Sequence, residues 1–256
     1  MSTKFINTGQ LPDDPFKMPP PHWRSPGIIF QLTISLEEII ELLVSLLDVH
    51  PEIDGLLMEY YDRNPDPNDD DEEFGEICNP LWELESKIIL KSELSIFMAS
   101  IQAEDDLNQV ITFNLHKDIA DTIEKLSPPE KLIIISANLT SKTVKGSKPY
   151  NAIRALTKWR NSYAHGHCTD RPTKSLRHNH LIAPEEYPSV PKAIENMKHQ
   201  LQGYLDVSSF LRKISRNKYT RMGSTHNNDI QEYMEEIDRY QFTYENEGMV
   251  YDLIYK

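Results

Sequence analysis

Apolar residues recur every three or four positions along most of this 256-residue chain. That spacing places them on one face of a helix and predicts amphipathic helices that share a core. The first of these helices is expected to begin at Ser35, with Leu36, Ile39 and Leu43 facing inward. Further helices are expected over about 79–114, 116–125, 131–137, 150–165, 191–217 and 229–240. The chain is therefore predicted to be mainly α-helical.

Two segments depart from the helical pattern. Residues 27–34 are rich in β-branched and aromatic side chains, and they are predicted to form a strand. Residues 242–255 are interpreted as a hairpin that adds a small sheet at the end of the chain.

The starts of several helices are marked by local signals. The segments Ser35–Glu38 and Ser127–Glu130 match capping boxes, in which two side chains bond the first backbone amides of a helix. Pro51 and Pro80 are each expected at the first position of a helix, where a missing amide hydrogen costs nothing.

We divide the chain into four segments. Residues 1–26 hold six prolines and are expected to form an extended arm. Residues 27–80 combine the predicted strand with helices and an acidic loop at about 64–73, which lacks the glycine and glutamate spacing of a calcium loop. Residues 81–218 form a helical bundle, and residues 219–256 form a helix with the hairpin. The expected fold is thus mainly α, with an N-terminal α/β extension and a short C-terminal tail.

The net charge of the chain is −13, but it is unevenly distributed. Residues 141–218 contain 15 Lys and Arg against 5 Asp and Glu, whereas the rest contains 12 basic and 35 acidic residues. A local basic surface on an acidic protein still attracts phosphate groups. The same surface could equally dock on acidic parts of the chain or on an acidic partner. The charge alone leaves both interpretations open.

Composition narrows the class of protein. A hydrophobic content of 39% is ordinary for a globular domain, and no apolar run reaches the ~18 residues of a membrane span. The first residues lack the apolar region of a signal peptide. Cys78 and Cys168 are the only cysteines, which is too few for a disulfide framework. We therefore expect a cytoplasmic protein with no membrane partner.

One octapeptide, Trp159 to Gly166, indicates a specific chemistry. It closes a predicted helix, with Gly166 where a residue following the last turn is expected. Arg160 can bind a phosphate, Asn161 can position it, and His165 can transfer a proton. Within one helix Arg160 and His165 lie about 140° apart, which is poor geometry for a site in a single chain. A second Arg-x4-His pair ends at His226 and is interpreted as chance.

The block from Ser127 to His167 resembles the HEPN superfamily, whose signature is Arg-x4–6-His, usually with Asn after the Arg. Pro128-Pro-Glu-Lys-Leu-Ile-Ile-Ile, a short basic loop and Lys148-Pro-Tyr-Asn-Ala-Ile-Arg-Ala-Leu-Thr-Lys-Trp-Arg-Asn-Ser-Tyr-Ala-His are similar to one bacterial HEPN-like group. Upstream, Glu104-Asp-Asp-Leu-Asn108 resembles a Glu-x-x-x-Asn element often seen there. The resemblance covers about 81–218. His167 stands where a related subgroup carries the modified Tyr of a His-x-Tyr motif, so that motif is not matched.

The resemblance implies a four- or five-helix up-down bundle at 81–218 that pairs into a homodimer, with two Arg/His sets facing one another across a cleft. It implies a metal-independent endoribonuclease, without cofactor, acting on single-stranded RNA as a toxin or defence effector. Arg160, Asn161 and His165 would be its catalytic residues. Its partners would be RNA, a second copy of the chain and, for a toxin, an antitoxin or regulatory protein. RNA-binding residues are expected among the lysines of the basic segment, namely Lys142, Lys145, Lys148 and Lys158.

Two alternatives to this chemistry use the same part of the chain. Arg160 could instead cap its helix or pair with Glu104, which would leave an inactive RNA-binding or protein-interaction module. A metal-dependent enzyme is the second alternative, because the segment that follows the motif is rich in possible metal ligands. It contains no Cys-x-x-Cys pair, so no metal ligand is assigned. These residues are His165, His167, Cys168, His178 and His180.

Overall fold

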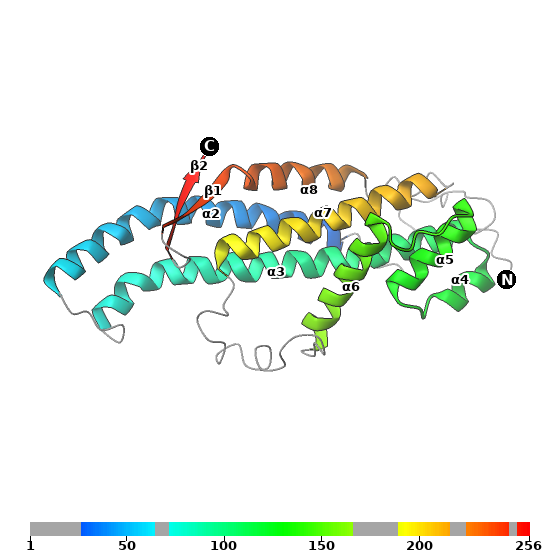
Figure 1. Ribbon diagram of the computed structural model, residues 1–256, viewed down its shortest axis with the longest axis horizontal. Helices are drawn as coiled ribbons and strands as arrows, with labels where there is room; N and C mark the ends of the chain where they lie inside the picture. Colours follow the sequence, from blue (N-terminus) through cyan, green and yellow to red (C-terminus); the bar gives the residue numbers. More distant parts are fainter. Residues whose placement is uncertain (1–26, 65–71, 166–188, 216–223, 246–249) are drawn as a thin grey trace.

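The structure is a computed structural model that describes residues 27–64, 72–165, 189–215, 224–245 and 250–256. Within these ranges the chain is mainly helical and the molecule is elongated (Figure 1). The described elements are seven helices and two strands: α2 (Gly27–Arg63), α3 (Glu72–Asn114), α4 (Lys117–Ile123), α5 (Pro128–Thr140), α6 (Lys148–His165), α7 (Val190–Ile214), α8 (Ser224–Ile237), β1 (Tyr240–Glu245) and β2 (Val250–Tyr255).

The two longest helices, α2 and α3, run antiparallel along most of the molecule (Figure 1). In α2 the buried residues follow a spacing of three and four from Ile29 to Leu46, so one face remains turned toward the core. In α3 buried residues such as Ala99 and Ala103 are small, which allows close helix packing. At the contact between the two helices, the Ser95 hydroxyl donates to the Ser35 hydroxyl at 3.0 Å.

The prediction of a strand at 27–34 is wrong, because α2 is already helical from Gly27 onward. Ile29 and Leu32 are buried and belong to the same helical series as Leu36. A β-branched residue lowers helix propensity only slightly, so burial of this face outweighs the local preference. The described residues therefore contain no N-terminal α/β part.

Three of the predicted helix starts lie inside longer helices. Ser35 and Glu38 do not cap a helix; they contact α3 instead, and Glu38 forms an ion pair with Lys91. Pro51 lies inside α2, and Pro80 lies inside α3. Each proline removes one backbone hydrogen bond, a loss that a long and well-packed helix tolerates. One helix thus stands where the sequence predicts a strand and two helices.

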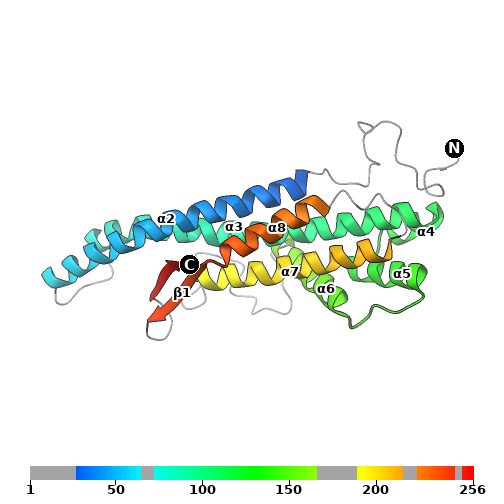
Figure 2. The same cartoon turned by 90° about the horizontal axis from the view of Figure 1, so that it is seen from above.

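The later helices are confirmed, with shifted ends. The capping box at the start of α5 is present, because Glu130 Oε2 accepts from the backbone amide of Ser127 at 2.9 Å. α7 ends at Ile214, and α8 begins at Ser224, about five residues earlier than predicted. α7 packs on α3, and α8 packs on α2 (Figure 2).

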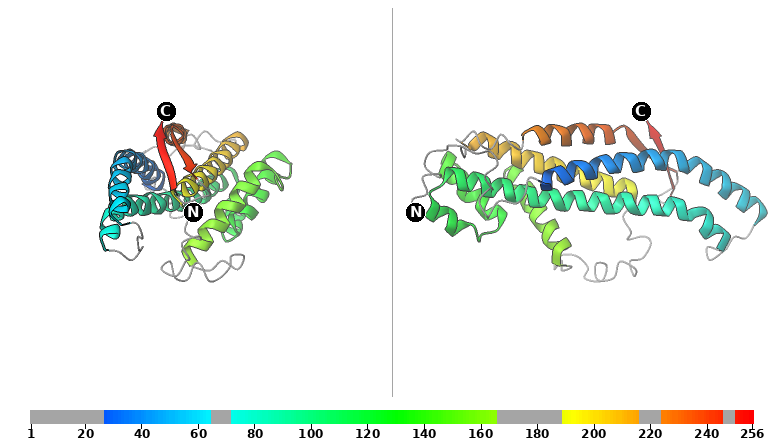
Figure 3. Two further views of the ribbon diagram at one scale, coloured as in Figure 1. Left: turned by 60° about the vertical axis from the view of Figure 1, so that its left-hand side comes forward. Right: turned by 180° about the vertical axis from the view of Figure 1, so that it is seen from behind.

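α6 crosses α3 and α7 at a steep angle (Figure 3). The crossing is close at Gly203 of α7, where an added Cβ atom would stand 3.3 Å from Cβ of Ala152. Small residues on both helices therefore set how near α6 lies to α7. The helix that carries the motif lies against the bundle here, and its residues Ile153 and Leu156 are buried in the core.

The predicted C-terminal hairpin is confirmed. β1 and β2 are antiparallel, and Tyr240 pairs with Tyr255 at one end while Glu245 pairs with Val250 at the other. Leu253 is buried in the same hydrophobic cluster that includes Ile29 of α2. The tail is therefore part of the core. None of the described helices is both long enough and apolar enough to cross a membrane.

A polar network lies between α3, α7 and α8. The Tyr204 hydroxyl is 3.3 Å from Asp106 Oδ2 and 3.2 Å from Asn227 Oδ1. Burial raises the pKa of Asp106 from 3.8 to about 7, with Asp105 adding to the effect and Gln102 opposing it. A tyrosine carries one proton and cannot donate to both acceptors. The network is therefore best satisfied when Asp106 is protonated and donates to Tyr204, which donates to Asn227.

We expect this network to make folding stability depend on pH. Because the folded pKa of Asp106 lies above its unfolded value, protonation of Asp106 stabilises the fold. The contribution is complete below about pH 4 and is lost as the pH rises through 7. Wild-type protein should lose about 2 kcal/mol of unfolding free energy between pH 5 and 7 relative to Asp106→Asn. Urea unfolding at several pH values measures this difference.

The matched control is Asp118→Asn, because Asp118 is exposed in α4 and lies outside the network. Its stability should follow the pH dependence of the wild type. Equal pH slopes for wild type and Asp106→Asn would show that Asp106 is ionised in the folded protein throughout this range.

Candidate functional site

The motif helix α6 is held on the bundle by its apolar side. Ile153 and Leu156 are buried, and Trp159 packs against the core. The apolar side of α6 therefore faces the core as far as Trp159. The loop before α6 turns at Gly146, whose φ of 82° suits a residue without Cβ. The buried side chain of Val144 fixes this loop to the core.

Arg160 reaches from α6 to α3 and pairs with Glu104. Its Nη1 atom donates to Oε2 of Glu104. The other carboxylate oxygen, Oε1, accepts from Nζ of Lys131 on α5 at 3.3 Å. Lys131 also donates to Oδ1 of Asn108 on α3 at 3.0 Å. Three helices therefore meet at one polar cluster, which consists of Arg160, Glu104, Lys131 and Asn108.

The charges of this cluster are unequal. Burial alone would raise the pKa of Glu104, but Arg160 and Lys131 outweigh that effect and hold the pKa below its usual value. Glu104 is therefore ionised at neutral pH and neutralises one of the two cations. Lys131 is only 2% exposed, whereas Arg160 is 20% exposed. The cluster keeps a net positive charge, and Arg160 is the cation that solvent or a ligand can reach.

Asn161 and His165 lie on a different side of α6 from Arg160. Oδ1 of Asn161 accepts from Nη2 of Arg160 at 3.4 Å, and Asn161 is exposed. His165 is the last residue of α6, and its side chain lies outside the described part of the structure. At 100° per residue, His165 shares a helix face with Asn161 and Lys158, and it is about 140° from Arg160. One chain thus joins Arg160 to Glu104 but does not bring Arg160 and His165 to one face.

The predicted RNA-binding lysines are at the surface. Lys142 and Lys145 are exposed in the loop between α5 and α6, and Lys148 is exposed at the start of α6. Nζ of Lys148 forms an ion pair with Asp206 of α7 at 2.9 Å. Lys158 is exposed on α6, immediately before the octapeptide. Three of these cations therefore lie before or at the start of α6, and the fourth lies near the middle of the helix.

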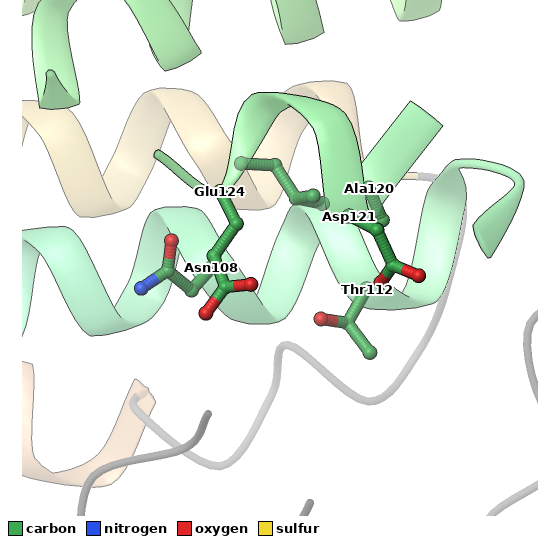
Figure 4. Close-up of a pocket in the computed structure, with 6 residues that line it drawn as sticks. Asn108, Thr112, Ala120, Asp121 and Glu124 are labelled. Atoms are coloured by element: carbon green, nitrogen blue, oxygen red, sulfur yellow. The ribbon is translucent and has the colours of Figure 1, made fainter. Parts of the chain in front are cut away.

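A shallow pocket adjoins the cluster at Asn108. It lies between α3 and α4, and Figure 4 shows Asn108 and Glu124 side by side at one end of it and Thr112 near Asp121 at the other. Two carboxylates in the lining disfavour a phosphate. We therefore do not assign this pocket to nucleic acid. Its lining residues are Asn108, Ile111, Thr112, Ala120, Asp121 and Glu124.

Lys131 is the member of the cluster that sequence reasoning missed. A signal for it exists, because Lys131 is four residues before Ile135 and three after Pro128, and all three are buried on one face of α5. A lysine in an apolar stripe predicts a buried partner. The partner itself, Glu104, lies 27 residues away and could be identified only by how α3 and α5 pack.

The side chains of the alternative metal site lie outside the described part of the structure. His167, Cys168, His178 and His180 all lie outside the described residues, as does the side chain of His165. Among the residues that the structure does describe, no group of three or more His, Cys, Asp or Glu side chains could hold a metal ion.

Comparisons of this chain with protein-family models, with curated proteins and with solved structures found no match. Its function therefore has to follow from its own residues and their arrangement.

Proposed function

We propose that this chain is a metal-independent endoribonuclease of the HEPN type, built on an up-down helical bundle, and that it acts as a homodimeric toxin or defence effector. The observation that carries the proposal is the polar cluster below the motif helix. It holds Arg160 in a fixed position and keeps one more positive charge than Glu104 neutralises. Such a cation, partly exposed and held in place by neighbouring side chains, suits a phosphate.

The proposed reaction needs no metal, because RNA carries its own nucleophile. His165 of one chain removes the proton from a 2′-OH group, whose oxygen then attacks the adjacent phosphorus. The bond from phosphorus to the 5′ oxygen breaks, and a second His165 protonates that leaving oxygen. Arg160 stabilises the negative charge that builds up on the phosphate, and the Asn161 amide donates to it. The products are a 2′,3′-cyclic phosphate and a 5′-OH end.

The positions of the residues on α6 are the reason for proposing a dimer. Arg160 and His165 are about 140° apart on the helix, so one chain cannot direct both at one phosphate. A two-fold axis beside α6 would allow Arg160 of one chain and His165 of the other to share a cleft. Lys158 and the exposed Asn161 lie on the same side as His165 and would line that cleft.

The competing proposal is an interaction module without catalysis. The pairing of Arg160 with Glu104 favours it, because an arginine that joins α6 to α3 has a structural role even without a ligand. The two proposals differ in RNA affinity. No measurable binding of the wild-type protein to RNA at low salt would leave the interaction module as the better account.

The test of the proposed function is cleavage of single-stranded RNA by the purified chain in the presence of EDTA. We expect cleavage with 2′,3′-cyclic phosphate ends, identified by mass spectrometry, and a dimer in sedimentation at micromolar concentration. Cleavage that needs a divalent cation would overturn the proposal and favour the His-rich segment. An active monomer would overturn the shared site.

RNA binding should depend on the lysines before and at the start of α6. Replacing Lys142, Lys145 and Lys148 by Glu is expected to weaken RNA binding and to flatten its salt dependence. The salt dependence is the slope of the logarithm of the binding constant against the logarithm of the salt concentration. For single-stranded RNA, each phosphate that the protein no longer binds lowers this slope by about 0.7, so three phosphates correspond to roughly 2 units. Filter binding at several salt concentrations measures both quantities.

A control variant separates this effect from total charge. In this control, Glu replaces Lys87, Lys117 and Lys256, so the net charge changes by the same amount. These lysines are exposed and lie outside the 141–218 segment. Equal weakening by both triple variants would mean that net charge, and not the proposed surface, governs affinity.

A further inference from the structure

One end of the molecule is a two-helix projection. The last turns of α2 and the first turns of α3 extend beyond α7, α8 and the C-terminal hairpin in two perpendicular views (Figures 1 and 2). We call this end of the α2–α3 helical hairpin the hairpin tip and define it as residues 48–64 and 72–85. It is separate from the C-terminal β-hairpin. Several large side chains of the hairpin tip are exposed to solvent.

Aromatic side chains form a continuous row on the hairpin tip. The ring of Tyr61 lies 6.5 Å from that of Phe74, which lies 6.3 Å from that of Trp82. Tyr60 is fully buried beneath them. Tyr61 and Trp82 are each 46% exposed, and Met58 is 71% exposed. Large apolar side chains that are exposed together in this way mark interaction surfaces.

The surroundings of this aromatic row are strongly acidic. The hairpin tip contains ten Asp and Glu and only one Lys or Arg, which is Arg63. Arg63 itself is paired with Glu73 at 2.7 Å. Aromatic faces and carboxylates both attract guanidinium and ammonium groups, so the tip suits a partner that presents Lys and Arg.

The same chain presents such groups near its other end. Lys142, Lys145 and Lys148 are exposed in and after the loop that follows α5, and Arg154 is exposed on α6. α4 and α5 form the end of the molecule opposite the hairpin tip (Figure 3). The tip and this basic surface therefore cannot meet within one chain, whereas they can meet between two chains.

We propose that the hairpin tip of one molecule docks on the basic α5–α6 surface of a second copy. Because the two surfaces differ, the contact is head-to-tail and leaves one free tip and one free basic surface in every complex that does not close into a ring. Ion pairs dominate it, so it is sensitive to salt. The proposal is independent of RNA cleavage, and it is distinct from a two-fold contact through α6.

The test uses two charge-reversal variants of the full chain without RNA. The tip variant carries Lys at Glu59, Glu72 and Glu76, all of which are exposed. The basic-surface variant carries Glu at Lys142, Lys145 and Lys148. Two-colour sedimentation at low and high salt follows self-association and mixed association of the labelled proteins.

We expect the average mass of the wild-type complexes to rise with protein concentration at low salt. At high salt this rise should disappear. Each variant alone should associate about tenfold more weakly or worse. A mixture of the two should regain association, because each supplies the surface that the other lacks, and the complexes should contain both in equal numbers. Trp82→Ala should weaken association without changing any charge.

The control variant carries Lys at Glu41, Glu232 and Glu235, which are exposed acidic residues outside the hairpin tip. It should associate as the wild type does. The proposal is overturned by a wild type that shows no salt-sensitive association at low salt, because the tip would then serve a different basic partner. It is equally overturned by a tip variant that associates normally, or by variants that do not combine when mixed.

Discussion

RNA cleavage should fall by about 100-fold or more when His165 is replaced by alanine, since a positioned acid or base contributes at least that much. Arg160→Ala should lower cleavage by a similar factor, because the developing phosphate charge would lose its main cation. His165→Ala should leave RNA affinity nearly intact, because the lysines around α6 carry most of the positive charge. Single-turnover rates and binding titrations on the same RNA measure the two effects separately.

The chain supplies a matched control for this experiment. His226 closes the second Arg-x4-His pair and lies in α8, where it contacts Asp229 at 3.3 Å. His226→Ala should cleave RNA at the wild-type rate. Activity that survives His165→Ala or Arg160→Ala would contradict the proposed mechanism. Thermal unfolding of Arg160→Ala must be compared with wild type, since Arg160 also joins α6 to α3.

Removing the Glu104 carboxylate should strongly destabilise the fold. Glu104→Leu leaves Lys131, which is 2% exposed, without its counter-charge and places an unpaired cation in the interior. Breaking a buried ion pair in this way costs about 3–5 kcal/mol. The double variant Glu104→Leu, Lys131→Met should recover much of that loss, because neither buried charge of the pair remains. Urea unfolding of the three proteins measures the differences.

An exposed pair on the same helix is the control for this prediction. Glu83 and Lys87 of α3 lie 2.6 Å apart but are both exposed, so Glu83→Leu should not weaken the fold measurably. If Glu104→Leu behaved like Glu83→Leu, the cluster would be solvated and could not hold Arg160 in place.

The sequence predicts those features that depend on neighbouring residues. α6 is predicted to within two residues, because its apolar stripe and its polar side alternate locally. The start of α5 is equally local, since Ser127 and Glu130 satisfy one another. In contrast, the first turns of α2 are mistaken for a strand, because β-branched residues favour a strand until the buried face of the whole helix is considered.

In the candidate site too, some features follow from neighbouring residues and others only from the packing of distant helices. Arg160, Asn161 and His165 can be selected from one octapeptide, and Glu104 can be named as an alternative partner for Arg160. That Lys131 binds the same carboxylate is fixed by the packing of α5 on α3 and has no counterpart in local sequence. In the proposed dimer, the position of Arg160 relative to His165 of the second chain would depend on an interface that local sequence does not encode.

The length of α3 has a mechanical consequence. This one helix carries Trp82 at the hairpin tip and Glu104 in the polar cluster, which are 22 residues apart and so separated by about 33 Å along its axis. A helix is stiff over that distance, so the two places would move together if α3 tilted. A slight tilt of α3 at the tip would move the Glu104 carboxylate relative to Arg160. Binding at the tip would therefore be coupled to the polar cluster if it tilted α3 against α2 and α7.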